Sequence, residues 1–268
     1  MRPDAIKLDF SWGRVSLLPS APYSIRDESR LCVLGLALER QQGVHALGGG
    51  RRQDFDAWPG ELAVTSPDVE LFSESGNGGE YLALHVQRVA PGFEPDILPT
   101  VPRAVFRGER LAVRLGRKLR YLMLALHRQP QLIEEEAMLL LDHGLSLLAL
   151  PHGARGGYAH DRPAHSRVLE YIDGAIDGPL SLDEIAQVAG MPVLRFLRSF
   201  SNAVGSTPHA YITERRMQRA RALLTATDNP IADIAASCGF AHQSHLGAVL
   251  KDRLSMTPRQ YRARGGRA

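Results

Sequence analysis

Up to about residue 100, short apolar runs alternate with residues that form turns. Two of these runs, residues 31–38 and 81–87, have the length of a β-strand. Glycine and proline clusters surround them at residues 48–50, 59–60 and 76–79. Many short strands at close spacing predict a small barrel or sandwich, and the repeated glycines disfavour helices.

From residue 109 the apolar spacing becomes helical. Leucines recur every three or four residues and so share one helical face, at Leu111, Leu115, Leu119, Leu122 and Leu126. Arg120 and its basic neighbours lie mostly off that line. The dipeptide Gln129-Pro130 then interrupts the run.

A second helix is expected before residue 150, with an inward face formed by Ile133, Ala137, Leu140 or Leu141, and Leu148. Two helices joined by a short break form an αα-hairpin. A second apolar side remains, at Leu139, Leu147 and Leu150. This side is expected to pack either on the barrel or on a second subunit, and in the latter case the hairpin dimerises the chain.

Residues 151–165 contain three glycines, two prolines and three histidines, a composition typical of a linker. Histidines in such a segment are usually solvated, so we expect no metal there. The pattern therefore predicts four segments: a sensor or assembly domain at 1–105, a helical hairpin at 106–150, a linker at 151–165 and a helical domain at 166–268.

The helical domain contains an internal repeat. Residues 181–190 resemble residues 230–239: in both, Ile-Ala is followed four residues later by glycine, Gly190 or Gly239. Each copy has the pattern of a short helix, a glycine turn and a second helix, which is a helix-turn-helix. Ser181 and Glu184 have the spacing of a capping box.

The second helix of each copy has an inward and an outward face. In the first copy Phe196, Phe200 and Ala203 face inward, and the outward set is Val193, Leu194, Leu197, Arg198 and Ser201. In the second copy Leu246 and Leu250 face inward, and the outward set is His242, Gln243, Ser244, Gly247, Ala248 and Lys251.

One long helix is predicted between the copies, over residues 208–226. It is basic, because it carries Arg215, Arg216, Arg219 and Arg221. A rigid helix would fix the separation of the two helix-turn-helix units. Two recognition helices about 34 Å apart could enter successive major grooves of DNA.

Charge supports an anionic partner for this domain. The net charge of the chain is only +3, yet residues 166–268 hold 13 Lys and Arg against 9 Asp and Glu. The positive excess therefore lies in the last hundred or so residues, where nucleic acid is the common partner. Of the 32 basic residues only Lys7, Lys118 and Lys251 are lysines, and coding bias explains most of that preference.

Composition excludes other classes. With 44% hydrophobic and 23% charged residues, the chain is typical of globular proteins. Cys32 and Cys238 lie far apart, which disfavours a disulfide framework or zinc site and fits a reducing cytoplasm. The N-terminus lacks the apolar region of a signal peptide, and no run is apolar enough to span a membrane.

From about His165 to Arg264 the chain resembles the AraC/XylS family of bacterial transcription regulators. The resemblance rests on many spaced positions: Leu-x-x-Ile-Ala (182–186), Ala-Gly-Met (189–191), Phe-x-Arg-x-Phe (196–200), Gly-x-x-Pro-x-x-Tyr-Ile (205–212), Arg-x-x-x-Ala-x-x-Leu-Leu (216–224), Ile-Ala-Asp-Ile-Ala (231–235), Cys-Gly-Phe (238–240), Gln-Ser-His (243–245) and Thr-Pro-x-x-Tyr-Arg (257–262). It implies DNA binding and control of transcription.

The N-terminal part is more weakly similar to the cupin-like sensor domains that precede this module. The fold expected is α+β and multidomain: a cupin-like β-barrel with a helical hairpin, then an all-α domain of two helix-turn-helix units. Enzymatic cupins hold a metal with clustered histidines, whereas here Val69-Glu70 occupies the candidate position and His45 and His85 stand alone. We therefore expect no metal, no cofactor and no enzyme activity.

The resemblance also implies roles for the outward residues. Arg198 matches a common base-reading arginine, suited to guanine. Leu194 and Leu197 occupy positions where polar, base-contacting residues are frequent. They could touch thymine methyl groups, contact another protein, or indicate that the first motif recognises DNA weakly. Gln243 suits adenine, and His242 or Ser244 could reach a base or phosphate. Lys251, Arg215 and Arg219 are candidate phosphate contacts, and Ala248 replaces a frequent arginine.

The function predicted is a cytoplasmic, sequence-specific transcriptional regulator, an activator, that binds promoter DNA as a homodimer. RNA polymerase and a small-molecule effector are further candidate partners, and no membrane is expected. The alternatives are a cupin metal enzyme with an appended helical domain and an architectural or protein-interaction module.

Overall fold

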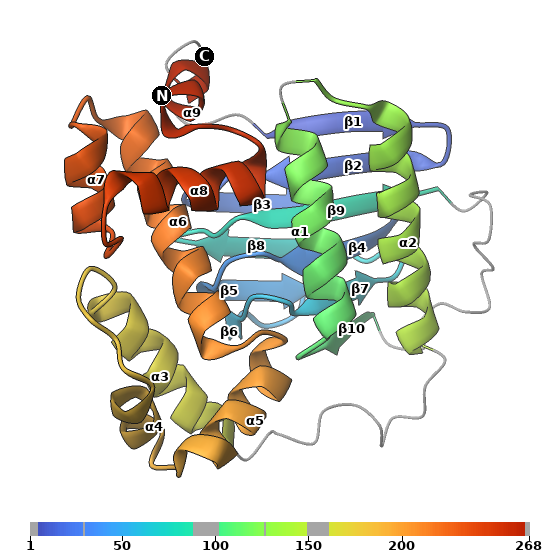
Figure 1. Ribbon diagram of the computed structural model, residues 1–268. Helices are drawn as coiled ribbons and strands as arrows, with labels where there is room; N and C mark the ends of the chain where they lie inside the picture. Colours follow the sequence, from blue (N-terminus) through green and yellow to red (C-terminus); the bar gives the residue numbers. More distant parts are fainter. Residues whose placement is uncertain (1–4, 29, 88–101, 126, 149–160, 266–268) are drawn as a thin grey trace. The chain divides into compact units, whose positions relative to one another are not determined.

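The computed structural model describes residues 5–28, 30–87, 102–125, 127–148 and 161–265. The chain divides into two compact units, one over residues 2–157 and one over residues 158–268. Figure 1 shows strands and two helices in the first unit and helices in the second. Mixed α and β structure with a helical C-terminal half is as predicted. None of the described helices has the length and apolarity needed to cross a membrane.

The N-terminal unit contains two antiparallel sheets. One has the strand order β1-β2-β9-β4-β7-β10 and the other β3-β8-β5-β6. The strand bounds are β1 (Ile6–Phe10), β2 (Gly13–Leu18), β3 (Tyr23–Asp27), β4 (Cys32–Ala37), β5 (Gln41–Leu47), β6 (Gln53–Ala57), β7 (Leu62–Thr65), β8 (Leu71–Ser75), β9 (Tyr81–Val86) and β10 (Arg103–Phe106). The two apolar runs expected as strands are β4 and β9, neighbours at the centre of the six-stranded sheet. The two sheets share no strand pair among the described residues, so the expected closed barrel is not confirmed.

Helices α1 (Arg110–Leu124) and α2 (Pro130–Leu148) form the predicted hairpin. They lie across the six-stranded sheet (Figure 1). Glycines permit the close approach: a Cβ atom on Gly116 would collide with Leu36, and one on Gly144 would collide with Leu34. The hairpin therefore packs on its own sheet through small residues that face the leucines of β4.

The face of α1 that enters the core differs from the predicted leucine line. Leu119 is buried, but Leu111 is exposed and Leu115 and Leu122 are half-buried; Leu126 lies outside the described residues. The buried positions are Ala112, Val113, Gly116, Leu119, Arg120, Met123 and Leu124. The close approach at Gly116, where a Cβ atom would collide with Leu36, helps to set which face of the helix meets the sheet.

The predicted inward face of α2 is largely confirmed. Ile133, Ala137, Leu140 and Leu141 are buried, and Leu148 is half-buried. The residues of the expected second apolar side, Leu139, Leu147 and Leu150, do not form one exposed surface. Leu147 is buried, Leu139 is 54% exposed, and Leu150 lies outside the described residues.

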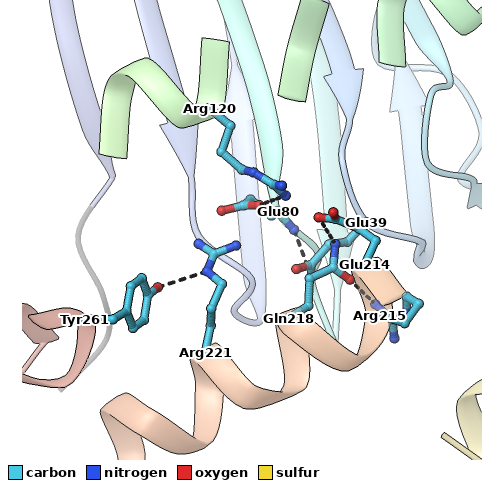
Figure 2. Close-up of polar contacts among 8 residues, drawn as sticks. All are labelled: Glu39, Glu80, Arg120, Glu214, Arg215, Gln218, Arg221 and Tyr261. Atoms are coloured by element: carbon cyan, nitrogen blue, oxygen red, sulfur yellow. Dashed lines mark hydrogen bonds and ion pairs between the residues drawn. The ribbon is translucent and has the colours of Figure 1, made fainter. Parts of the chain in front are cut away.

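A buried ion pair joins α1 to the turn before β9. The guanidinium of Arg120 lies 3.1 Å from the carboxylate of Glu80, and both side chains are almost fully buried. The backbone N–H of Glu80 donates to the Glu39 carboxylate at 3.3 Å, as Figure 2 shows. Removing one partner would leave a buried charge without its counterion, which destabilises a protein far more than loss of a surface pair.

We predict that Arg120→Met destabilises the N-terminal unit by about 3–5 kcal/mol. Trp12 and Trp58, the only tryptophans of the chain, are both buried in this unit. Their fluorescence during urea unfolding therefore reports this unit alone. Arg14→Met is the matched control, because the Arg14–Asp9 pair is exposed; if it destabilised as much as Arg120→Met, the buried pair would not hold the role assigned to it.

The C-terminal unit contains seven helices in its described residues. They are α3 (Arg162–Gly174), α4 (Leu182–Ala189), α5 (Val193–Val204), α6 (Pro208–Ala226), α7 (Ile231–Ser237), α8 (Gln243–Leu254) and α9 (Pro258–Gly265). The helix predicted over residues 208–226 is α6. The linker predicted up to residue 165 was extended too far, because Arg162 to His165 belong to α3. Pro163 lies in the first turn of α3, a position that suits proline at a helix start.

Candidate nucleic-acid interface

The first helix-turn-helix consists of α4 and α5. The Ser181 hydroxyl accepts from the Glu184 N–H at 3.2 Å, and the Glu184 carboxylate accepts from the Ser181 N–H at 3.1 Å. The predicted capping box is therefore confirmed. Gly190 ends α4 with φ +66°, the left-handed conformation that this turn requires and that glycine adopts at little cost.

Helix α5 has largely the two faces that its sequence predicts, although Ala203, expected to face inward, is half-buried and Val204 is buried in its place. Phe196, Phe200 and Val204 are fully buried, and the two phenylalanine rings lie 5.4 Å apart. On the opposite side Leu194 and Arg198 are exposed. The remaining candidates on that side, Val193, Leu197 and Ser201, are half-buried. The core contacts thus fix the rotation of α5 about its own axis, so its candidate readers point outward.

The second helix-turn-helix consists of α7 and α8. Leu246 and Leu250 are buried. The imidazole of His242, the residue before α8, accepts from the His245 N–H at 3.3 Å and so caps the helix. The predicted outward residues are exposed except for Gly247, which is half-buried. The exposed ones are His242, Gln243, Ser244, Ala248 and Lys251.

The two copies are not in the same register throughout. Their glycines are 49 residues apart, but α5 begins at Val193 and α8 at Gln243, 50 residues later. The second turn is therefore one residue longer. With this offset the buried positions coincide, pairing Phe196 with Leu246, Phe200 with Leu250 and Val204 with Leu254.

The same offset pairs the outward residues. Leu194 corresponds to Ser244, and Arg198 corresponds to Ala248. The first helix thus presents an apolar residue and an arginine where the second presents a hydroxyl and a methyl group. The two helices are built alike but offer different chemistry to a ligand.

Three of the four arginines of α6 are engaged inside the C-terminal unit. Arg215 lies 2.8 Å from the Asp173 carboxylate and also donates to Gln218 at 2.9 Å. Arg216 donates to the carbonyl oxygens of Ile176 at 3.0 Å and Gly178 at 2.7 Å. Burial lowers the pKa of Arg216. Arg221 donates to the Tyr261 hydroxyl at 3.0 Å.

These contacts show that three arginines of α6 have partners inside the C-terminal unit. Figure 2 shows the chain from Arg215 through Gln218 to Glu214, and separately the bond between Arg221 and Tyr261. Arg215 holds α6 to α3 through Asp173 and stays a predicted phosphate contact. Arg219 is exposed and remains a candidate phosphate contact. The cluster of arginines in the sequence could not distinguish these roles, because the acidic and carbonyl partners lie about 40 residues away.

Two arginines that the sequence patterns did not assign to DNA contact, Arg259 and Arg262, lie beside α8. A cavity of about 440 Å³ is lined by Ile231, Gln243, Arg259, Arg262 and Ala263. Arg262 donates to the Asn229 carbonyl at 2.6 Å, and Arg259 is exposed. The spacing of three residues, which places both arginines on one face of a helix, was the signal available in the sequence.

A buried polar network joins the start of the unit to α5. His165 Nε2 lies 2.8 Å from Ser199 Oγ, and Ser199 donates to the Asp161 carboxylate at 2.7 Å. Burial lowers the pKa of His165 below its ordinary value of 6.5, and the nearby Asp161 carboxylate partly opposes that shift. Of the three linker histidines, His165 is thus part of the fold, and His152 and His160 lie outside the described residues.

The isolated strand histidines also have structural neighbours. The His45 ring stacks on Phe55 at 5.5 Å, and His85 Nε2 lies 3.6 Å from the Asp27 carboxylate. Among the residues that the structure describes, no group of three or more His, Cys, Asp and Glu side chains is arranged to hold a metal ion.

We predict that the C-terminal unit loses stability as pH falls below about 6.5 and that His165 contributes to this loss. A lowered folded-state pKa means that the unfolded chain binds the proton more readily, so acid favours unfolding. Helical circular dichroism during urea unfolding at pH 7.5 and pH 5.5 measures the effect, and the fluorescence of Trp12 and Trp58 identifies the separate transition of the N-terminal unit. His165→Gln should reduce the difference between the two pH values, and an unchanged difference would show that His165 is not responsible.

Comparison with known proteins matches the same region. A family model described as a helix-turn-helix domain matches residues 185–264. The HTH-type transcriptional regulator MtrA of Neisseria gonorrhoeae is 32% identical over 103 residues, which cover 37% of this chain and 34% of that protein. The transcriptional regulator Rob of Salmonella typhimurium is 36% identical over 95 residues, or 35% of this chain and 33% of that protein.

Two further matches are similar in extent. The HTH-type transcriptional activator RhaS of Yersinia pestis is 30% identical over 97 residues, covering 36% of each chain. A crystal structure of an AraC-type transcriptional regulator from Chromobacterium violaceum has 32% identity, covers 40% of this chain and 96% of that one, and gives a TM-score of 0.38. The chain spans about a third of the length of the curated relatives it matches.

The C-terminal unit is therefore a double helix-turn-helix domain, with two such motifs joined by α6. Over residues 185–264 this unit is similar to the helix-turn-helix domains of AraC/XylS-type regulators.

Proposed function

We propose that this chain is a sequence-specific DNA-binding regulator of transcription that acts as an activator. The observation that carries the proposal is the pair of outward faces on α5 and α8, each held by a buried core on its opposite side. MtrA, RhaS and Rob, which are named as transcriptional regulators or activators, support the same function. The relatives named above are regulators, so the metal-enzyme alternative is not favoured.

The proposed base and groove contacts come from both recognition helices. On α5 they are Val193, Leu194, Leu197, Arg198 and Ser201, and around α8 they are His242, Gln243, Ser244 and Lys251. Arg198 is suited to the O6 and N7 atoms of guanine, and Gln243 to N6 and N7 of adenine. Arg219 and Arg259 are the proposed phosphate contacts beside these helices. Arg215, which pairs with Asp173, is proposed as a further phosphate contact.

The N-terminal unit is proposed to be a cupin-like sensor or assembly domain over residues 1–105, followed by the hairpin at 106–150. Polar side chains of the smaller sheet support a sensing role: the Tyr23 hydroxyl donates to Gln41 at 3.0 Å and lies 3.2 Å from Ser73. Leu132 and Leu139 on α2 are exposed and support dimerisation through the hairpin. The regulator is proposed to act in the cytoplasm on promoter DNA, with RNA polymerase and a small-molecule effector as further partners.

Selection of genomic fragments by the purified chain tests this function. A regulator of this kind should enrich a discrete site upstream of genes. Enrichment without a shared site would instead favour an architectural protein.

On the selected site, Arg198→Ala should cost about 1–3 kcal/mol of binding free energy and relax the preference at one base pair. The reason is that a bidentate contact to guanine is lost. Gel shifts over a set of single-base variants of the site measure both effects. Arg167→Ala, which removes an exposed arginine from α3, is the matched control. Equal affinity of the Arg198 variant and the wild type would rule out this arginine as a reader.

A further inference from the structure

The first turn of α5 carries an apolar surface open to solvent. Leu194 is 72% exposed, the highest value for a large hydrophobic side chain among the described residues. Val193 precedes it, and Leu197 lies one turn later; both are half-buried. Isolated exposed leucines are ordinary on protein surfaces. What distinguishes this one is its place on the helix.

Leu194 is the second residue of a recognition helix. In docked helix-turn-helix domains the N-terminal residues of this helix contact base edges in the major groove. Arg198 follows four residues later, so both side chains lie on one face of α5. The apolar surface is thus continuous with the arginine proposed to read DNA. This continuity favours DNA as its occupant over a separate protein.

The chemistry of the bases selects one ligand for such a surface. A leucine side chain neither donates nor accepts a hydrogen bond, so placing it against the polar edge of guanine, adenine or cytosine would desolvate groups without replacing their bonds. Thymine presents a C5 methyl group in the major groove. Covering this methyl group with apolar atoms removes it from water, which lowers the free energy of the complex.

We infer that Leu194 reads thymine by covering its C5 methyl group, with Val193 and Leu197 extending the apolar contact. This inference rests on the proposed function and names the base that α5 selects beside the guanine read by Arg198. The two motifs then recognise bases by different chemistry. Helix α8 contacts bases through the hydrogen-bonding groups of Gln243 and Ser244, and α5 contacts them through one arginine and an apolar patch.

Replacing thymine by deoxyuridine tests the inference, because the exchange removes only the methyl group. The probe is the genomic duplex selected by the purified chain, with each thymine exchanged singly in the half that Arg198→Ala weakens. One exchange should weaken binding by the wild type about three- to fivefold, as expected for loss of one buried methyl group. Leu194→Ala should bind the thymine and deoxyuridine duplexes equally. Because Leu194 is exposed, this variant should fold normally.

Leu111→Ala is the matched control: it removes an exposed leucine that is not among the proposed DNA contacts, and it should keep the full response to deoxyuridine in the α5 half. The inference is overturned if no exchange weakens the wild type, or if Leu194→Ala responds as the wild type does. A variant that keeps DNA affinity and methyl response but loses activation would assign Leu194 to a protein partner and also overturn it. Failure of the proposed function looks different, since the chain would then select no DNA site.

Discussion

The placement of both recognition helices depends on how α6 is held. This helix separates the two motifs, and its arginines bind at three places inside the same unit. Arg215 pairs with Asp173 of α3, Arg216 binds two carbonyl oxygens just after α3, and Arg221 binds Tyr261 of α9. An ion pair that is partly shielded from water resists screening by salt. The contacts tie α6 to elements that precede the first motif and follow the second.

On this support the two motifs are similar in construction and different in surface. The glycine turns, Gly190 and Gly239, both adopt the left-handed conformation, and the buried positions of α5 and α8 coincide once the longer second turn is taken into account. Packing therefore constrains the inward faces alike. The outward faces are free of that constraint, which is why an arginine can occur at one position and an alanine at its counterpart. Specificity can differ between the motifs at no cost to the fold.

The parts of the structure that are local in sequence were predictable. The bounds of α6, the capping box at Ser181 and the inward phenylalanines of α5 all follow from spacing within one or two turns of helix. Contacts between segments that are distant in sequence could not be predicted. The roles of Arg120, Arg215 and Arg221 depend on partners about 40 residues away, and an arginine that is buried looks the same in sequence as one that is solvated.

The inward face of α1 shows a second limit, because a row of leucines does not reveal that the sheet requires glycine at its closest approach. The candidate site itself was found from its motif, and the structure added Arg259 and Arg262 beside Gln243.

We propose that α5 and α8 read two successive major grooves on one face of DNA. Hydroxyl-radical footprinting of the selected site by the purified chain tests it most directly. Two protected segments are expected, centred about one helical turn, or about 10 base pairs, apart. Arg198→Ala should weaken one segment and Gln243→Ala the other. A single protected segment, or loss of both segments with either variant alone, would contradict separate reading by the two helices.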